Sequence, residues 1–213
     1  MTETTTTADD SPDDPLESFV HTQCTALWHG YQADRAKAVA DLAELRRTVP
    51  VNGTLHQVSW ELFARKPGLP EQRFDAGDTP TRTELAAAAA LALFALHQQS
   101  RRTTPMHRRG PKHSLGAAAH QVQRRVGSEG IERRMQALLR SQSIGPILEQ
   151  LRALVSILRD HEIPLDYARL ARDLRAAQTP NGLRGVRVRW SRDFYRPGAE
   201  PADDTDTTSG ETA

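Results

Sequence analysis

The stretch LAAAAALALFAL, residues 85–96, decides the fold because it has no polar residue over about three helical turns. Alanine and leucine are strong helix formers. Thr81 and Glu84 precede the stretch with the spacing of a capping box, which marks the start of a helix. The run covers 12 residues, whereas a membrane span needs about 20. It therefore predicts a helix buried in the protein core, not a membrane anchor.

Amphipathic helices are predicted on both sides of this stretch. Apolar residues recur there at intervals of three and four, which is the period of one helical face. Six predicted helices have both ends defined and cover residues 17–31, 33–48, 131–139, 147–158, 167–177 and 183–195. Two more have only a predicted start: one begins with a capping box formed by Thr54 and Gln57, and the other begins at Ser114. The last segment alternates apolar and basic residues and also permits a strand, but we favour a short helix. Residues 67–80, with their prolines and glycines, predict a loop.

The expected fold class is all-α, with helix bundles on either side of a basic loop at residues 100–113. We expect an N-terminal helical half at residues 18–110 and a C-terminal helical half at residues 111–197. Residues 1–17 and 198–213 are rich in Thr, Asp, Ser and Pro, and we expect disordered acidic tails there. The tails would keep the body soluble or compete weakly for its basic surface.

Charge is strongly separated along the chain. Residues 19–198 contain all 28 Lys and Arg residues but only 16 of the 27 Asp and Glu residues. The body therefore carries an excess of about 12 positive charges, although the whole chain has a net charge of +1. Of the basic residues, 25 are arginine, which can bind phosphate oxygens through two parallel hydrogen bonds. Codon composition also favours arginine over lysine, but it does not account for the excess of charge.

Several classes of protein are disfavoured by the sequence. Cys24, the single cysteine, lies on an apolar helical face and predicts a buried structural thiol, not a nucleophile. The first residues show neither a basic flank nor an apolar signal segment, so we expect a cytoplasmic protein without a membrane partner.

Catalytic and metal-binding motifs are also missing. The sequence contains no HExxH, CxxC or phosphate-binding glycine loop. His107, His113 and His120 stand among cations, where a divalent metal would be poorly placed. The acidic residues suggest caps and helix partners, such as a pair between Arg169 and Asp173. We therefore expect neither an enzyme nor a cofactor nor a metal site.

The basic residues predict a nucleic-acid surface. Arg133 and Arg140 should face away from the apolar side of their helix, with Arg134 at its flank. Alone, this helix would suggest only a solvated face, but further clusters favour a binding surface. These clusters are Arg46 and Arg47, then Arg101, Arg102, Arg108, Arg109 and Lys112, and finally Arg124 and Arg125. Aromatic residues make up only 5% of the chain, so we expect contacts to phosphates without base recognition.

Several segments also carry a family resemblance. They are SLG at 114–116, ERRMQALLRS at 132–141, LRALVSILRDHEIPLDYARLARDL at 151–174 and VRVRWSRDFYR at 186–196, supported by ALWHGY, WELFARKPG and the alanine-rich helix. In order and spacing, the chain resembles the CasB-type small subunit of the type I-E CRISPR Cascade surveillance complex. The resemblance covers nearly all of residues 19–196, whereas the acidic tails lie outside the family pattern.

The resemblance implies a non-catalytic helical subunit, present as two copies in a ribonucleoprotein with guide RNA and other Cascade subunits. Such a subunit helps to hold guide RNA and target DNA and stabilises the displaced non-target strand of the R-loop. Aligned by position with the family, Arg82 is added to the predicted nucleic-acid contacts. The resemblance also supports Arg46, Arg47, Arg133, Arg134 and Arg140. The basic residues of the loop at 101–112 are weaker candidates. The alternative is a free-standing helical DNA-binding regulator with a helix in the major groove.

Overall fold

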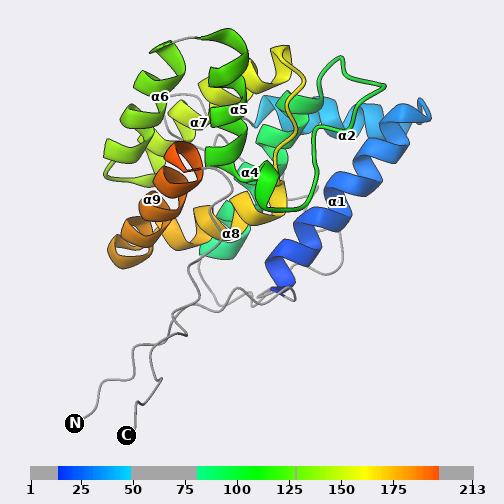
Figure 1. Cartoon of the computed structure of the whole chain (residues 1–213). Helices are drawn as coiled ribbons and strands as arrows, with labels where there is room; N and C mark the ends of the chain where they lie inside the picture. The colour runs from blue at the N-terminus through cyan, green and yellow to red at the C-terminus, as the bar shows by residue number, and fades with distance from the viewer. Residues whose placement is uncertain (1–13, 49–80, 128, 197–213) are drawn as a thin grey trace, which may run out of the picture.

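The computed structural model describes residues 14–48, 81–127 and 129–196, which form an all-α fold (Figure 1). The α-helices of these ranges are α1 (Pro15–Gln32), α2 (Ala36–Arg47), α4 (Arg82–Gln98), α5 (Leu115–Val126), α6 (Glu129–Arg140), α7 (Ile144–Asp160), α8 (Tyr167–Ala177) and α9 (Pro180–Tyr195). A short 3-10 turn, Pro111–His113, precedes α5. The predicted fold class is confirmed.

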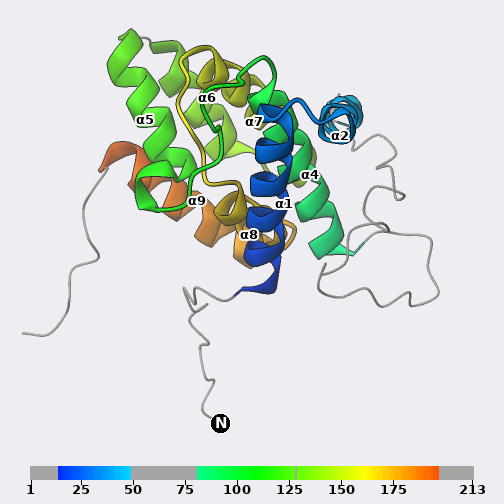
Figure 2. The ribbon, with the colours of Figure 1, turned by 90° about the vertical axis from the view of Figure 1, so that its right-hand side faces the viewer.

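Helix α4 is the centre of the core, as its apolar run predicts. The Glu84 backbone N–H donates to Thr81 Oγ1 at 3.2 Å, and the Thr81 N–H donates to Glu84 Oε2 at 2.7 Å, which completes the predicted capping box. Every residue from position 86 to 95 is buried. A helix that is apolar all round needs neighbours on every side, and α4 packs against α1, α2, α7 and α8. Figure 2 looks onto α1 and shows α4 and α8 beside and behind it.

Helices α5 and α9 pack against each other and against α6. Gly116 on α5 lies against the α9 backbone, so that a Cβ added at this position would come within 2.7 Å of the Phe194 backbone nitrogen. This close approach agrees with the small residues at positions 116–119. Helix α8 contacts α1 and α4 on one side and α9 on the other. The two predicted helical halves therefore share one core across the described residues.

The first and the last helix of the described fold both begin earlier than predicted. Helix α1 begins at Pro15 with Asp14 as its N-cap, and Leu16 and Glu17 are buried, so these residues belong to the body and not to a tail. The last helix is longer than predicted because the Thr179 side chain caps it at Pro180. The predicted capping box at Thr54 and the loop at residues 67–80 lie outside the described residues.

Cys24 is buried in the core, as its place on the apolar face of α1 predicts. None of the helices in the described ranges has the length and apolarity that a membrane span needs.

Candidate nucleic-acid interface

Helix α6 presents an exposed row of arginines. Its buried side consists of Ile131, Met135 and Leu138, which pack into the core. Arg133, Arg134 and Arg140 are exposed, and none of them forms an ion pair with another described residue. Their guanidinium groups are therefore available to an anion from outside.

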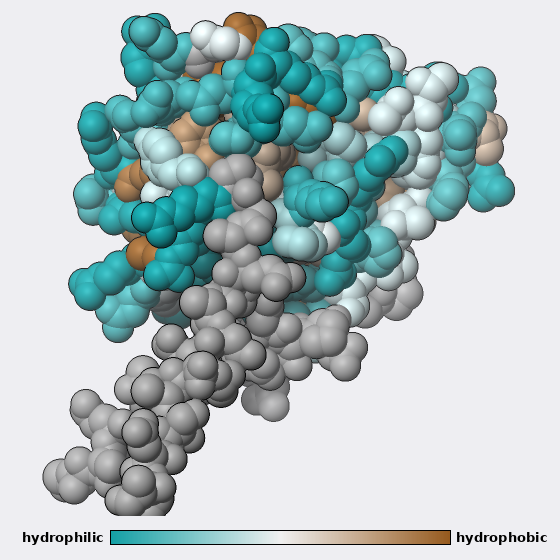
Figure 3. Space-filling model, viewed as in Figure 1, coloured by the Kyte–Doolittle hydropathy of each residue, from teal (hydrophilic) through white to brown (hydrophobic). Residues whose placement is uncertain are grey.

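The end of α5 adds two more basic residues to this surface. Arg124 and Arg125 are exposed in the last turn of α5, and Gly127 turns the chain toward α6 with a positive φ of 63°. Arg125 donates to the His161 carbonyl oxygen at 3.0 Å, which leaves its charge without a carboxylate partner in the described part of the chain. Helices α5 and α6 contact each other. We call these residues the hairpin surface: Arg124, Arg125, Arg133, Arg134 and Arg140. Figure 3 shows that the face of the molecule that carries α5 and α6 is largely hydrophilic.

Three arginines of the basic loop are engaged within the protein. Arg101 pairs with Glu162 at 2.9 Å, and Arg102 pairs with Asp34 at 2.7 Å and lies 4.6 Å from the centre of the Tyr31 ring. Hydrogen bonding to Asp34 raises the pKa of Arg102. Arg109 pairs with Glu17 at 3.2 Å and lies 3.7 Å from Asp166. Arg108 and Lys112 are exposed and form no ion pair with the described residues.

The loop backbone is fixed as well. Met106 is fully buried, and its carbonyl oxygen accepts from the Leu165 N–H at 3.1 Å. The Tyr167 N–H donates to His107 Nδ1 at 3.2 Å, so a neutral His107 carries its proton on Nε2 and donates it to His21 Nδ1 at 2.9 Å. The loop is therefore held against α1 and the start of α8.

A stability measurement separates the two kinds of loop arginine. We expect Arg109→Ala to lower the free energy of unfolding by about 1–2 kcal/mol, because Glu17 and Asp166 are buried and would lose a cationic partner. Arg108→Ala serves as the control: Arg108 is exposed like Arg109 but forms no ion pair with the described residues, so its loss should change this free energy by less than about 0.5 kcal/mol. Urea denaturation measures both; equal effects would contradict the assignment of Arg109 as a structural tie.

The other predicted contacts lie apart from the hairpin surface. Arg47 is exposed and Arg46 half-buried in the last turn of α2, whereas Arg82 is exposed at the start of α4. Helix α2 packs against α1 and α4, whereas α6 packs against α5, α7 and α9. In Figures 1 and 2, α2 lies on the side of the molecule away from α5 and α6. The predicted residues therefore do not form a single cluster.

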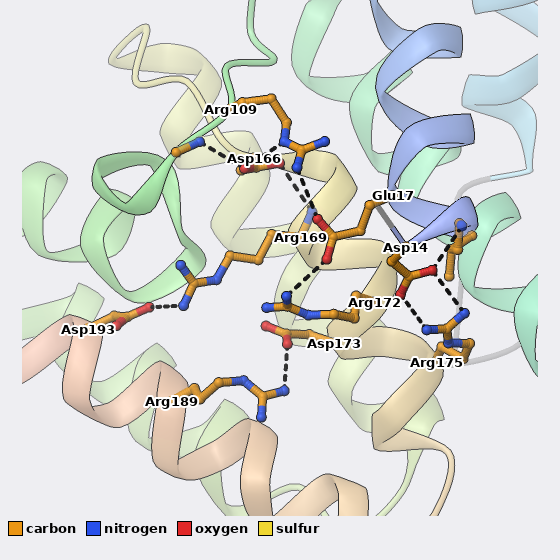
Figure 4. A network of polar contacts seen from close by, with 12 residues as sticks. Asp14, Glu17, Arg109, Asp166, Arg169, Arg172, Asp173, Arg175, Arg189 and Asp193 are labelled. Atoms are coloured by element: carbon orange, nitrogen blue, oxygen red, sulfur yellow. Dashed lines mark hydrogen bonds and ion pairs between the residues drawn. The ribbon is translucent and has the colours of Figure 1, made fainter. Parts of the chain in front are cut away.

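A network of ion pairs joins α1, α8 and α9 (Figure 4). Arg172 and Arg175 on α8 pair with Glu17 and Asp14, respectively. Burial raises the pKa of Glu17, while the nearby charges of Arg172 and Arg109 act in the opposite direction. These arginines hold the start of α1 against α8.

The predicted pair between Arg169 and Asp173 is wrong. Arg169 pairs with Asp193 on α9 at 3.3 Å. The Asp173 carboxylate is buried and accepts from Arg189 and from the Trp190 indole N–H, each at 2.7 Å. The spacing within α8 allows the local pair, but the tertiary partners on α9 desolvate Asp173 and satisfy both of its oxygens.

The family of the chain follows from the comparison with known proteins. The model of the family described as CRISPR-associated protein Cse2 matches residues 41–195. The chain belongs to the Cse2 family. A solved structure, described as the crystal structure of CasB from Thermobifida fusca, is 33% identical in sequence with a TM-score of 0.68, and the match covers 85% of this chain and 98% of that one. The comparison with curated proteins gave no match.

The part that matches the Cse2 family contains every predicted contact residue and all of α9. Helix α9 and the residue that follows it add basic residues that the sequence prediction does not include: Arg184, Arg192 and Arg196 are exposed. Their signal in the sequence is the run of arginines at residues 184–196, which the alternation with apolar residues obscures. Across the described ranges, no group of three His, Cys, Asp or Glu side chains is placed to hold a metal ion.

Proposed function

We propose that this Cse2-family chain is a non-catalytic subunit of a CRISPR RNA-guided surveillance complex in the cytoplasm. In this role it binds the sugar-phosphate backbone of guide RNA and target DNA and stabilises the displaced non-target strand of the R-loop. Its protein partners would be the other Cascade subunits and a second copy of itself. Family membership and the solved CasB structure support the assembly part of this proposal.

The observation that carries the nucleic-acid part is the difference between two sets of arginines. Those on α8 are engaged by Asp14, Glu17 and Asp193. The arginines of the hairpin surface have no carboxylate partner among the described residues. Exposed guanidinium groups without an internal counter-ion bind phosphates, displace counter-ions and carry no information about sequence.

Such contacts suit an R-loop because strand exchange there is close to energetic balance, so that a few backbone contacts to one strand shift the equilibrium. Arg108, Lys112, Arg46, Arg47 and Arg82 are proposed as further contacts. Arg101, Arg102 and Arg109 would each have to give up a carboxylate partner to bind a phosphate, which makes them the weaker candidates.

The salt dependence of binding tests the hairpin surface. We expect the Arg133→Ala/Arg134→Ala variant to bind unrelated nucleic-acid sequences more weakly, because both guanidinium groups are exposed and unpaired in the described structure. The slope of log affinity against log salt should become shallower by roughly 0.7 to 0.9 for each lost phosphate contact. Fluorescence anisotropy with labelled strands over a salt series gives the slope.

The control for net charge is Arg35→Ala/Lys37→Ala, which also removes two exposed positive charges but lies at the start of α2, where Lys37 pairs with Asp41 at 3.1 Å. If both variants changed the slope equally, the effect would be one of net charge, and the hairpin surface would not be a specific contact.

The alternative function, a free-standing DNA-binding regulator, makes a different prediction. A regulator prefers one duplex sequence by several kcal/mol, whereas the proposed subunit binds strands with little regard to sequence. Purification of the full chain from its host distinguishes the two. Co-elution with small RNAs of uniform length and several proteins supports the subunit; a lone protein that selects one duplex from a random pool contradicts it.

A further inference from the structure

The outer side of α9 carries a row of residues that the hairpin surface does not include. Arg184, Val188, Arg192 and Tyr195 follow one another at intervals of three and four residues and are all exposed. At 3.6 residues per turn, they fall within about 80° of the helix circumference. We call these four residues the α9 ridge.

The ridge contains large exposed apolar side chains, which are rare in the part of the chain that the structure describes. Three large apolar side chains are exposed in the described ranges, and two of them, Val188 at 44% and Tyr195 at 51%, belong to the ridge. The Tyr195 ring stands nearly perpendicular to the buried Phe194 ring, with 4.8 Å between the centroids, and half of the Tyr195 residue stays exposed. An exposed aromatic ring one helical turn from the guanidinium group of Arg192 is suited to a ligand that is both flat and anionic.

No acidic residue of α9 shares this side of the helix. The only carboxylate in α9, Asp193, lies about 180° around the helix from Arg184 and pairs with Arg169. Arg189, outside the ridge, is engaged by Asp173. Arg184 and Arg192 form no ion pair within the described part of the chain. On the inner side of α9 the charges of Arg189 and Asp193 are thus paired, whereas the charged residues of the ridge are all positive.

We propose that the α9 ridge is a second nucleic-acid contact, specific for single strands, in which Arg184 and Arg192 bind phosphates and the Tyr195 ring stacks on an unpaired base. This inference deepens the proposed function, on which it rests, by adding a site and a stacking contact to an unpaired base. Stacking needs a base that is not paired within a duplex, and aromatic rings on a cationic track are how proteins bind single strands without selecting a sequence. One valine and one tyrosine are too little apolar area for a stable protein interface, which argues against a protein as the occupant.

The position of α9 connects the ridge to the hairpin surface. Arg187, on the flank of α9, donates to the carbonyl oxygen of Ser141, the residue that follows Arg140. Helix α9 also packs against α5 and α6 (Figure 1). The end of α6 therefore lies beside the flank of α9, and in this proposal the two surfaces bind successive parts of one strand.

Binding to two kinds of strand tests the proposal. The probes are a labelled mixed-sequence DNA single strand and a strand of equal length made of abasic deoxyribose phosphate, each measured by anisotropy with the full-length protein. Tyr195→Ala should weaken binding of the normal strand roughly five-fold or more and leave binding of the abasic strand unchanged. Tyr195→Phe should bind both strands with the affinity of the wild-type protein, because the aromatic ring is retained. Equal affinity of Tyr195→Ala and the original protein for the normal strand would overturn the stacking role.

The phosphate contacts are tested by Arg184→Ala/Arg192→Ala. This variant should lose affinity for both strands, and its salt slope should become shallower by roughly 0.7 for each contact. The Arg133→Ala/Arg134→Ala variant is the reference. If the reference variant weakens binding while the α9 variants do not, the ridge is overturned and the proposed function stands. If neither set weakens binding, the proposed function fails as well. All substituted residues are exposed, and thermal unfolding confirms that each variant is folded.

Discussion

Replacing Gly116 with alanine is expected to lower the free energy of unfolding by about 2–3 kcal/mol. A Cβ at this position would lie 2.7 Å from the Phe194 backbone nitrogen and closer still to the Trp190 carbonyl oxygen. Backbone atoms cannot rotate out of the way as a flexible side chain can, so α5 and α9 would have to separate. The loss would exceed the gain in helix propensity of about 1 kcal/mol that the change from glycine to alanine brings.

Gly185 provides the matched control because it lies within α9 and has room for a side chain. A Cβ there would meet only Arg189 Nη1 at 3.5 Å, which is an ordinary contact. Gly185→Ala should therefore leave the free energy of unfolding unchanged or raise it by up to about 1 kcal/mol. Chemical denaturation of both variants gives the two signs. If Gly116→Ala proved as stable as Gly185→Ala, the close approach of α5 and α9 would be refuted.

Acidification is expected to produce the second large effect, a loss of about 4 kcal/mol in the free energy of unfolding between pH 7 and pH 5. Burial lowers the pKa of His97 to about 3 and that of His107 to about 4. In the unfolded chain each imidazole titrates near its ordinary pKa of 6.5. The unfolded state therefore binds more protons below this pH, and the stabilisation present above it is lost as the pH falls toward the folded-state values.

Each of these two histidines contributes about half of this loss, or about 2 kcal/mol by pH 5. Burial lowers the pKa of His113 too and adds to the effect, whereas the raised pKa of Glu17 acts against it. The hydrogen bonds agree with neutral rings: His107 Nδ1 accepts from the Tyr167 N–H, and His97 Nδ1 lies 2.9 Å from the Tyr167 hydroxyl oxygen. A second proton on His107 would have to displace this backbone donor.

Urea denaturation at several pH values measures the effect, and two variants assign it. His97→Asn and His107→Asn each remove one titrating group, so each should be less stable at pH 7 but lose about 2 kcal/mol less on acidification. If the pH dependence of both variants matched that of the original protein, other groups would be responsible.

Much of the fold could be predicted from local sequence. The capping box of Thr81 and Glu84 and the unbroken apolar run behind it specify both the start of α4 and its burial. In α1, α6 and α7 the apolar residues repeat with the helical period. These residues are the buried ones in the structure, because burial of one face stabilises each helix. The predicted boundary between the acidic tail and the body is too late because Glu17 looks like part of the tail, yet its carboxylate is buried and pairs with Arg109 and Arg172.

The candidate site could be predicted only in part. Helical periodicity is enough to expose Arg133, Arg134 and Arg140, since the opposite face of α6 is apolar. In the basic loop, Arg108 and Arg109 are neighbours in the sequence, but only Arg109 forms ion pairs in the described structure. No local pattern distinguishes them, because their partners come from α1 and from the start of α8.

The sequence by itself determined the all-α class, the central helix and the excess of positive charge, because these depend on residues within one helix or on a sum over the chain. Only the tertiary structure decided which arginines remain open to a ligand. Asp173, for example, is taken up by Arg189 and Trp190 of α9 and not by Arg169 of its own helix. Ion pairs form between side chains that packing brings within a few ångströms. The local periodicity of the sequence does not give the distance between side chains on two different helices.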